Sequence, residues 1–337
     1  MRVWEIRESF GLESLKLCER ETPRPGPGQV VVRVRAASLN YRDLLTVEGL
    51  YNPKQPLPLV PLSDGAGEVE AVGNEVQRVA PDDRVAGVFA PHWIAGRPTR
   101  ERLRSTLGGP LDGMLAERVC LDAEGVVRFP EHLSFEEAAC LPCAAVTAWN
   151  AVAGTDPLVA GEMLLVLGTG GVSLLALQLA RACGARVVVT SSSDAKLARA
   201  RALGATDVVN YRTSPEWDRV VKDLTGGTGV DRVVEVGGAG TLARSLRCVR
   251  IGGTICLIGN LAGLDAQLNL AQVFMRAVRL QGVLVGSRES FEAMNRAIAL
   301  HELRPPIDRV FSFDEVPAAF AHLKSGAHFG KLVVRVD

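Results

Sequence analysis

The chain has 337 residues, 47% of them hydrophobic and 23% charged, which is long enough for two domains that each bury a core. Lysine and arginine together number 38, as do aspartate and glutamate, so no net charge favours nucleic acid or an anionic membrane as a partner. Charged residues occupy the start of the chain, where a signal peptide would need an apolar core. No apolar run approaches the roughly 20 residues of a membrane span. We therefore expect a soluble, cytoplasmic protein.

The N-terminal part, residues 1–128, contains short β-rich runs separated by glycine and proline, such as 29–35 and 66–73. This pattern predicts a small, irregular β domain. The segment 97–104 is strongly charged. We interpret it as a solvated loop or helix rather than a binding patch.

From residue 129 to 287, β-branched apolar runs alternate with helical patterns. Six strands are expected, at 164–167, 187–190, 208–210, 232–235, 254–258 and 280–285. Strands joined by crossover helices form a parallel sheet with helices on both faces. The sequence therefore predicts an α/β domain with a doubly wound, parallel, six-stranded sheet.

The last part, residues 288–337, predicts two helices and two strands. The helices are expected at 291–301 and 316–324, and the strands at 310–313 and 331–336. We assign the closing strand to the first domain, because the central sheet already has six strands. The expected domains are thus 1–128 with 288–337, and 129–287.

The seven cysteines are odd in number and scattered along the chain, which argues against a disulfide framework and fits a reducing compartment. Cys140 and Cys143 form the one close pair, and no second pair supplies a four-thiolate zinc site. We expect the cysteines to be small packing residues.

A glycine turn follows the first strand of the central domain, where the chain reads Leu-Gly-Thr-Gly-Gly-Val-Ser over residues 167–173. Gly168 would allow a tight reversal, and Gly170 would let the backbone approach a phosphate. The N–H groups at the helix start, from Gly171 and Val172, would bind the anion. Ser173 stands where a third glycine is usual, and we expect only a local packing adjustment there.

The end of the second strand of this domain indicates which dinucleotide binds. An NAD enzyme carries an acidic residue about 20 residues after the glycine turn, which binds the ribose 2′-hydroxyl. Here Ser191 and Ser192 occupy that region, with Lys196 shortly after. Hydroxyls and an ammonium can bind a 2′-phosphate, so NADP(H) is the expected cofactor. We interpret the nearby Asp194 as a helix N-cap.

Several motifs together resemble the medium-chain dehydrogenase/reductase superfamily over nearly the whole chain. They are the GTGGVS turn, ASLNYRDLL at 37–45, GLY at 49–51 and FGKLVVRV at 329–336. Within that superfamily the chain is similar to the zinc-independent quinone oxidoreductases and to polyketide enoyl reductase modules. The resemblance implies a GroES-like catalytic domain, a Rossmann domain, NADPH, and hydride transfer in a cleft between the domains.

The resemblance also shows which positions of this chain correspond to the zinc ligands of related enzymes. Zinc dehydrogenases of the superfamily place a cysteine where Asn40 stands, and Gly-His-Glu where Leu62, Ser63 and Asp64 stand. Cys143 alone could persist as a ligand, and one thiolate cannot hold Zn²⁺. We therefore expect no metal. Without a Lewis acid a conjugated carbonyl is the better substrate, because hydrogen-bond donors alone can stabilise an enolate.

The resemblance places residues 40–43 on the loop that faces the nicotinamide. Asn40 could polarise a carbonyl oxygen or fix the nicotinamide ribose. Tyr41 is either a proton donor to the enolate or an aromatic wall with a solvated hydroxyl, and we favour the wall. Arg42 and Asp43 are interpreted as a structural ion pair, and Tyr51 as a residue that shapes the pocket.

The resemblance adds four cofactor-binding residues. Tyr211 would lie beside the adenosine phosphate, and the other three, Thr147, Gly237 and Asn260, would line the nicotinamide end. The sequence therefore predicts a zinc-independent, NADPH-dependent reductase of quinones or other α,β-unsaturated carbonyls. The alternatives are a zinc-free alcohol or aldehyde dehydrogenase, and a nucleotide-binding protein with a mainly structural or regulatory role.

The last expected strand of the central sheet, at 280–285, is the basis for predicting the oligomeric state. This strand is apolar and would leave an exposed edge unless something covers it. Pairing with a two-fold mate would satisfy that edge. We expect a homodimer formed through the Rossmann domain, as in the quinone oxidoreductases.

Overall fold

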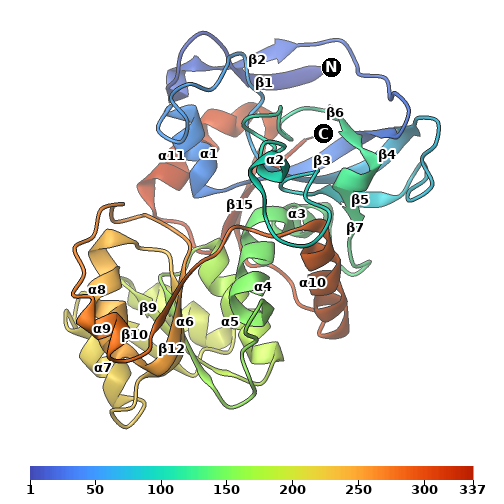
Figure 1. The fold of residues 1–337 in the computed structure, drawn as a ribbon. Helices are drawn as coiled ribbons and strands as arrows, with labels where there is room; N and C mark the ends of the chain where they lie inside the picture. The colour runs from blue at the N-terminus through green and yellow to red at the C-terminus, as the bar shows by residue number, and fades with distance from the viewer. Residues whose placement is uncertain (337) are drawn as a thin grey trace. The chain divides into compact units, whose positions relative to one another are not determined.

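The computed structural model describes residues 1–336, and the chain divides into two compact units. The first unit contains Met1–Val146 and Val285–Asp337, and the second contains Thr147–Leu284. The two units have separate hydrophobic cores. Each unit is described by itself below, with the element labels of Figure 1.

The first unit is built on a seven-stranded sheet in the order β14-β15-β3-β4-β5-β7, with β6 also paired to β3. A separate antiparallel pair, β1 with β2, completes its strands. The strands are β1 (Arg2–Ile6), β2 (Leu15–Glu19), β3 (Gln29–Leu39), β4 (Asp64–Val72), β5 (Arg84–Gly87), β6 (Arg118–Asp122), β7 (Val126–Arg128), β14 (Ile307–Ser312) and β15 (Lys331–Arg335).

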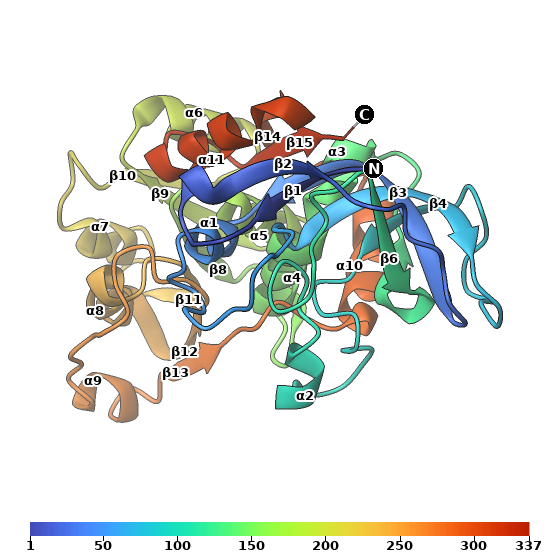
Figure 2. The ribbon, with the colours of Figure 1, turned by 90° about the horizontal axis from the view of Figure 1, so that it is seen from above.

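Short helices connect these strands. They are η1 (Leu12–Ser14), α1 (Tyr41–Val47), α2 (Arg100–Leu103), η2 (Ala123–Gly125), α3 (Phe135–Ala139), η3 (Leu141–Ala145), α10 (Arg288–Leu300), η4 (Phe313–Glu315) and α11 (Val316–Ser325). Figure 2 shows α11 beside β14 and β15. The irregular β architecture and the return of the closing strand to this unit agree with the sequence-based expectation.

The closing strand β15 joins the sheet between β14 and β3. It pairs antiparallel to β3, with Leu332 opposite Leu39 and Val334 opposite Ala37. Its first four residues are buried, which a strand covered on both faces requires. This register brings the end of the chain beside the residues that follow β3.

The segment 129–146, which we expected to belong with the nucleotide sheet, clusters with the first unit instead. Helix α3 begins at a capping box of Ser134 and Glu137 and contacts β3, β4 and β15. The Ser38 hydroxyl donates a hydrogen bond to the Ala139 carbonyl over 2.8 Å. Residues 129–146 therefore belong to the first unit because they pack against its sheet. The local sequence pattern does not reveal this packing.

The second unit is a parallel six-stranded sheet in the order β10-β9-β8-β11-β12-β13. This confirms the predicted doubly wound α/β fold. The strands are β8 (Met163–Leu167), β9 (Arg186–Ser191), β10 (Asp207–Asn210), β11 (Val230–Glu235), β12 (Val249–Leu257) and β13 (Arg279–Gly282).

Helices alternate with these strands (Figure 1). They are α4 (Val146–Ala153), α5 (Gly171–Ala182), α6 (Asp194–Ala202), α7 (Trp217–Asp223), α8 (Ala239–Cys248) and α9 (Ala271–Phe274). Every residue of β8 is buried, as the continuous apolar run of a central parallel strand requires. The carboxyl ends of β8 and β11, neighbours in the sheet, therefore lie side by side.

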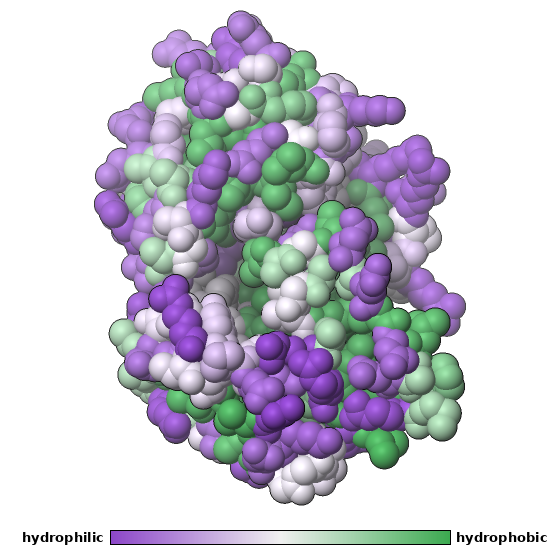
Figure 3. Space-filling view, turned by 90° about the vertical axis from the view of Figure 1, so that its left-hand side faces the viewer, coloured by the Kyte–Doolittle hydropathy of each residue, from purple (hydrophilic) through white to green (hydrophobic). Residues whose placement is uncertain are grey.

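Exposed apolar side chains gather in the last part of the second unit. They include Leu264, Leu270, Phe274, Met275 and Leu284, each at least 55% exposed. Figure 3 shows one side of the molecule, where hydrophobic atoms lie among hydrophilic ones in the lower part of the view. Strand β13 lies at the same end of the sequence and forms one edge of the sheet.

Candidate functional site

The glycine turn joins the end of β8 to the start of α5. Gly168 has a φ of +75°, and a Cβ added at Gly168 or Gly170 would meet no atom within 4 Å. The turn therefore borders open space. The N–H groups of Gly171 and Val172 lie in the first turn of α5, where a helix leaves its donors without intrahelical partners. These residues fit the pyrophosphate of a dinucleotide.

Ser173 takes the place of the usual third glycine without obstructing the turn. Its side chain is 2% exposed, and its hydroxyl donates a hydrogen bond to the Leu167 carbonyl over 2.7 Å. The hydroxyl thus ties the first turn of α5 to the end of β8. This is the local packing adjustment that we expected from the sequence.

The end of β9 brings two of the predicted cofactor residues together. Ser191 is buried, and its carbonyl accepts a hydrogen bond from the Tyr211 N–H over 3.0 Å. The Tyr211 side chain is 42% exposed, so its ring is available to a ligand. Ser192 and Lys196 are both half-buried, Ser192 just before α6 and Lys196 in its first turn.

Helix α6 begins one residue earlier than we inferred. Ser193 is its N-cap, and the Ser193 hydroxyl accepts the Lys196 N–H over 3.4 Å. Asp194 is therefore the first helical residue and not the N-cap, which corrects the sequence-based interpretation. Its carboxylate accepts the Asn210 side-chain N–H over 2.7 Å. Serine competes well for an N-cap, and three serines precede Asp194, so sequence alone did not decide the position.

Two loops of the second unit meet where Gly237 and Asn260 lie. The Ala262 N–H donates to the Gly237 carbonyl over 2.7 Å, and the Gly263 N–H donates to the Asn260 carbonyl over 3.0 Å. Both loops follow carboxyl ends of parallel strands, β11 and β12, where ligands of doubly wound sheets bind. Thr147, the remaining residue predicted for the nicotinamide end, is buried near the start of α4.

A buried carboxylate organises the first of these loops, and the sequence analysis missed it. Glu235, at the end of β11, is 0% exposed. Its Oε1 accepts hydrogen bonds from the Gly237 N–H over 2.9 Å, the Gly238 N–H over 3.1 Å and the Thr241 hydroxyl over 2.5 Å. Its Oε2 accepts from the Ser245 hydroxyl. An acidic residue at the end of an apolar strand was the signal that could have found it.

In the first unit, Asn40 lies directly after β3 and belongs to a buried polar network. The Asn40 Oδ1 accepts a hydrogen bond from the Lys331 ammonium over 2.5 Å. The Asn40 amide Nδ2 approaches the Ser63 hydroxyl at 3.5 Å, and that hydroxyl donates to Asp64 over 2.7 Å. The sequence analysis did not single out Lys331, although it quoted the motif that contains this residue.

Arg42 and Asp43 form the predicted ion pair, with Nη1 and Oδ1 separated by 3.3 Å. Arg42 also donates to the carbonyls of Leu107 and Gly109, over 3.0 and 3.2 Å. Asp43 is 0% exposed and accepts the Asn40 backbone N–H over 2.8 Å. Burial raises the pKa of Asp43 to about 6, although Arg42 opposes that shift.

The two tyrosines of this region differ in their contacts. The Tyr51 ring stacks on the Arg42 guanidinium, 4.9 Å from its centre, while Phe89 lies 5.1 Å from the same group. Tyr51 thus packs on the Arg42 guanidinium, and its role in shaping a pocket stays a prediction. The Tyr41 side chain is 40% exposed, and within residues 1–336 no hydrogen bond to its hydroxyl is seen. Its role stays a prediction.

The residues in the place of the superfamily's zinc ligands do not fit a zinc ion. Asn40 and Ser63 offer an amide and a hydroxyl, and burial raises the pKa of the Cys143 thiol well above its usual range. Cys143 would also be a single ligand, and a catalytic zinc site needs three protein ligands. The Lys331 ammonium lies 3.9 Å from Asp64 and would repel a divalent cation. Among residues 1–336, no three His, Cys, Asp or Glu side chains cluster as a metal site.

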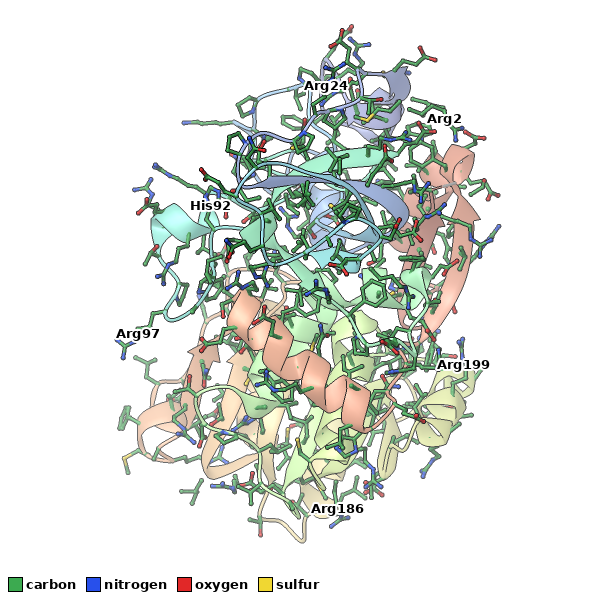
Figure 4. The ribbon with its side chains drawn as sticks, turned by 90° about the vertical axis from the view of Figure 1, so that its right-hand side faces the viewer. Arg2, Arg24, His92, Arg97, Arg186 and Arg199 are labelled. Atoms are coloured by element: carbon green, nitrogen blue, oxygen red, sulfur yellow. The ribbon has the colours of Figure 1, made fainter. Side chains whose placement is uncertain are left out.

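The charged segment 97–104 is a surface element, as we expected. Thr99 caps the short helix α2, and Arg100 and Glu101 are exposed. Figure 4 shows the Arg97 side chain pointing away from the rest of the molecule. No helix within the described residues has the length and apolar character that crossing a membrane needs.

Comparisons with known proteins agree with this architecture. Residues 26–131 match the family model of the alcohol dehydrogenase GroES-like domain, and residues 171–299 match that of the zinc-binding dehydrogenases. A zinc-type alcohol dehydrogenase-like protein of Schizosaccharomyces pombe is 43% identical, covering 98% of this chain and 97% of that protein.

Solved structures also resemble this chain along its whole length. An NAD-dependent alcohol dehydrogenase is 36% identical with a TM-score of 0.92, covering 100% of both chains. A variant of a crotonyl-CoA carboxylase/reductase in complex with NADP is 25% identical with a TM-score of 0.89, covering 100% of this chain and 95% of that one.

The fold and these matches define an oxidoreductase that combines a GroES-like domain with a parallel six-stranded Rossmann sheet. The chain belongs to the medium-chain dehydrogenase/reductase superfamily.

Proposed function

We propose that this chain is an NADPH-dependent reductase that transfers hydride to quinones or other α,β-unsaturated carbonyls without zinc. The observation that carries the proposal is the polar network at Asn40. It offers hydrogen-bond donors where zinc dehydrogenases carry thiolate and imidazole ligands. Donors of this kind can stabilise an enolate oxygen, whereas a simple alcohol or aldehyde is hard to polarise without a metal.

The residues around the glycine turn support a nicotinamide dinucleotide. The turn at Gly168 and Gly170 borders open space that a pyrophosphate would fill. Ser191, Ser192 and Lys196 follow β9 and would bind a 2′-phosphate, and the similar crotonyl-CoA carboxylase/reductase was solved with NADP. The Glu235 network would hold the loop of Gly237 against the nicotinamide end.

The residues of the first unit would act on the substrate. NADPH, when bound, would supply the hydride for the β-carbon of the conjugated carbonyl, and negative charge would then develop on the carbonyl oxygen. The half-buried Asn40 amide would donate a hydrogen bond to that oxygen. Tyr41 or water would deliver the proton, and Tyr51 on Arg42 would form one wall of the pocket.

One specific observation favours a second function, a zinc-free alcohol dehydrogenase. The 36% identical neighbour is an NAD-dependent alcohol dehydrogenase. A regulatory nucleotide-binding protein would bind the dinucleotide without turnover. The three possibilities differ in what they do with a substrate, so one set of assays separates them.

The test is a steady-state assay of NADPH oxidation with a panel of quinones and enones, run beside NAD(P)⁺ reduction with primary and secondary alcohols. We expect turnover in the first assay and little in the second. Turnover only with alcohols would replace the proposal by the dehydrogenase, and nucleotide binding without turnover would favour the regulatory role. Elemental analysis should find no stoichiometric zinc, and chelator should leave the activity unchanged.

A further inference from the structure

Lys331 is a buried cation with few partners. Its residue is 3% exposed, and its ammonium donates to the Leu39 carbonyl over 2.7 Å and to the Asn40 Oδ1 over 2.5 Å. Asp64 lies 3.9 Å away and supplies the opposite charge. An ammonium has three donors and no acceptor, and burying it is costly unless it is paired. The two hydrogen bonds and the Asp64 carboxylate together compensate for burying the ammonium.

The ammonium fixes which way the Asn40 amide faces. Because Lys331 can only donate, the Asn40 oxygen must face it and Nδ2 must face away. Ser63 enforces the same orientation from the other end, since its hydroxyl proton is given to Asp64 over 2.7 Å and its lone pair faces Nδ2 at 3.5 Å. One of the two Nδ2 protons then remains without an acceptor among residues 1–336.

The fold brings these residues together from three separate strands. Lys331 is the first residue of β15, and the ladder that places Leu332 opposite Leu39 sets it beside Asn40. Asp64 is the first residue of β4 and lies opposite Ser38 on the other side of β3. The Asp64 Oδ2 also accepts the Cys143 N–H over 3.1 Å, so the carboxylate itself is held.

We propose that Lys331 is a positioning residue that, together with Asp64, holds the Asn40 amide with an N–H directed at the carbonyl oxygen of the substrate. This inference rests on the proposed function, in which Asn40 is that donor. Without Lys331 only the long contact of 3.5 Å to Ser63 would orient the amide, and an amide oxygen facing a developing enolate would repel it. Fixing the amide beforehand keeps the donor in place when the charge develops.

The test is a double-mutant cycle with Lys331→Met, Asn40→Ala and the double variant, measured on a slow enone. We expect each single variant to lower kcat by about tenfold or more with an unchanged affinity for NADPH. The double variant should be no slower than Asn40→Ala, because Lys331 then has no amide left to orient. Losses that multiply would show that Lys331 acts independently of Asn40, which overturns the proposal.

Two further variants control for folding. Lys324→Met removes an exposed lysine of the same unit, paired with Glu48 over 2.7 Å, and should leave kcat at the parental value. Lys331→Arg keeps donors toward the Asn40 oxygen and should recover part of the activity lost in Lys331→Met. Thermal unfolding is measured for every variant, and if Lys331→Met does not fold, the cycle is run with Lys331→Met combined with Asp64→Asn, which removes the ammonium without leaving the Asp64 charge unpaired.

A second readout separates this inference from the proposed function. If the parent reduces no quinone or enone, the proposed function fails, and the orientation of Asn40 is tested without turnover. The ¹⁵N side-chain resonance of Asn40, identified by its loss in Asn40→Ala, should shift in Lys331→Met (or in Lys331→Met with Asp64→Asn if Lys331→Met alone does not fold) and stay in place in Lys324→Met. An unchanged resonance would show that Lys331 does not hold the amide.

Discussion

At the scale of single residues, Asp43 gives a prediction about pH. Its pKa is raised by burial, and further by Asp64, to about 6 from 3.8. The folded protein therefore holds a proton between about pH 4 and 6 that the unfolded chain releases, so this group contributes less stability as the pH rises through 6. A shift of about two pKa units corresponds to about 3 kcal/mol.

The Asp43→Asn variant isolates this contribution, because asparagine does not titrate. Urea unfolding of parent and variant is measured between pH 4.5 and 7.5. We expect the parent to lose about 2 kcal/mol of free energy of unfolding relative to the variant over this range, which is the part of the total of about 3 kcal/mol that falls above pH 4.5. Any constant offset from exchanging an oxygen for an NH₂ cancels in this comparison. A difference that stays flat over the range would show that Asp43 titrates as an ordinary carboxyl.

A single variant can decide whether Tyr41 donates a proton to the enolate or only forms a wall of the pocket. If its hydroxyl protonates the enolate, Tyr41→Phe should lower kcat on a slow enone by about 10² to 10⁴-fold, with little change in NADPH affinity. Quinones accept electrons readily, so the same variant should lose less with a quinone. A rate within about twofold of the parent on the enone falls outside the range of acid catalysis, and Tyr41 would then be a pocket wall.

Lys196 is the predicted reader of the 2′-phosphate. Loss of a charged donor to phosphate costs about 1.5 to 3 kcal/mol, or roughly tenfold or more in affinity. Lys196→Ala should therefore bind NADPH more weakly and NADH almost as before, as measured by nucleotide fluorescence. Arg201→Ala, an exposed residue on the same helix, is the matched control and should change neither. Equal losses for both nucleotides would assign the phosphate to another group.

At the scale of elements, a substitution in the glycine turn should change NADPH binding without changing the stability of the fold. Gly170 has a φ of −81°, and an added Cβ would meet open space, so Gly170→Ala should fold as stably as the parent. The same methyl group would occupy the space of the pyrophosphate and weaken NADPH binding by about tenfold or more.

Gly168→Ala is the companion variant. The Cβ that alanine would add at this position also points into open space. The backbone φ of +75° is one that alanine avoids, so the substitution should cost about 1 to 3 kcal/mol of stability. This variant should lose thermal stability as well as binding, whereas Gly170→Ala should lose binding alone. Full NADPH affinity in Gly170→Ala would place the pyrophosphate away from this turn.

At the scale of the whole molecule, the edge of the central sheet predicts the oligomeric state. Strand β13 pairs with β12 on one side only, and Leu284 beside it is 55% exposed. An unpaired strand edge invites another strand, and a two-fold mate closes the assembly. We expect light scattering to give the mass of a homodimer at micromolar concentration.

Gly282→Pro tests the edge directly. The Val283 N–H donates to the Leu257 carbonyl over 3.0 Å, so by alternation the Gly282 N–H faces the free edge. Proline removes this donor, and an added Cβ at Gly282 meets nothing within 4 Å. The variant should be a folded monomer. A parent that is already monomeric, or a folded variant that stays dimeric, would show that the edge does not form the interface.

The sequence by itself determined the elements and the family. Strand β8 and the glycine turn could be predicted because their information is local: an apolar run, glycines at fixed spacing, and a helix that follows. The six strands could be predicted for the same reason, although the last one ends at Gly282 and not at residue 285 as we expected. Where neighbouring residues compete for one position, as Ser193 and Asp194 do for the start of α6, the local pattern was insufficient.

Only the tertiary structure decided which side chains meet. Lys331 and Asn40 lie almost a whole chain apart, and the register of β15 on β3 joins them. Packing on the first sheet likewise decided that residues 129–146 belong with the first unit. Periodicity reports which face of an element is buried, but not which element covers it. The partner of a buried charge therefore follows from the strand ladder and cannot be inferred from the residues next to it.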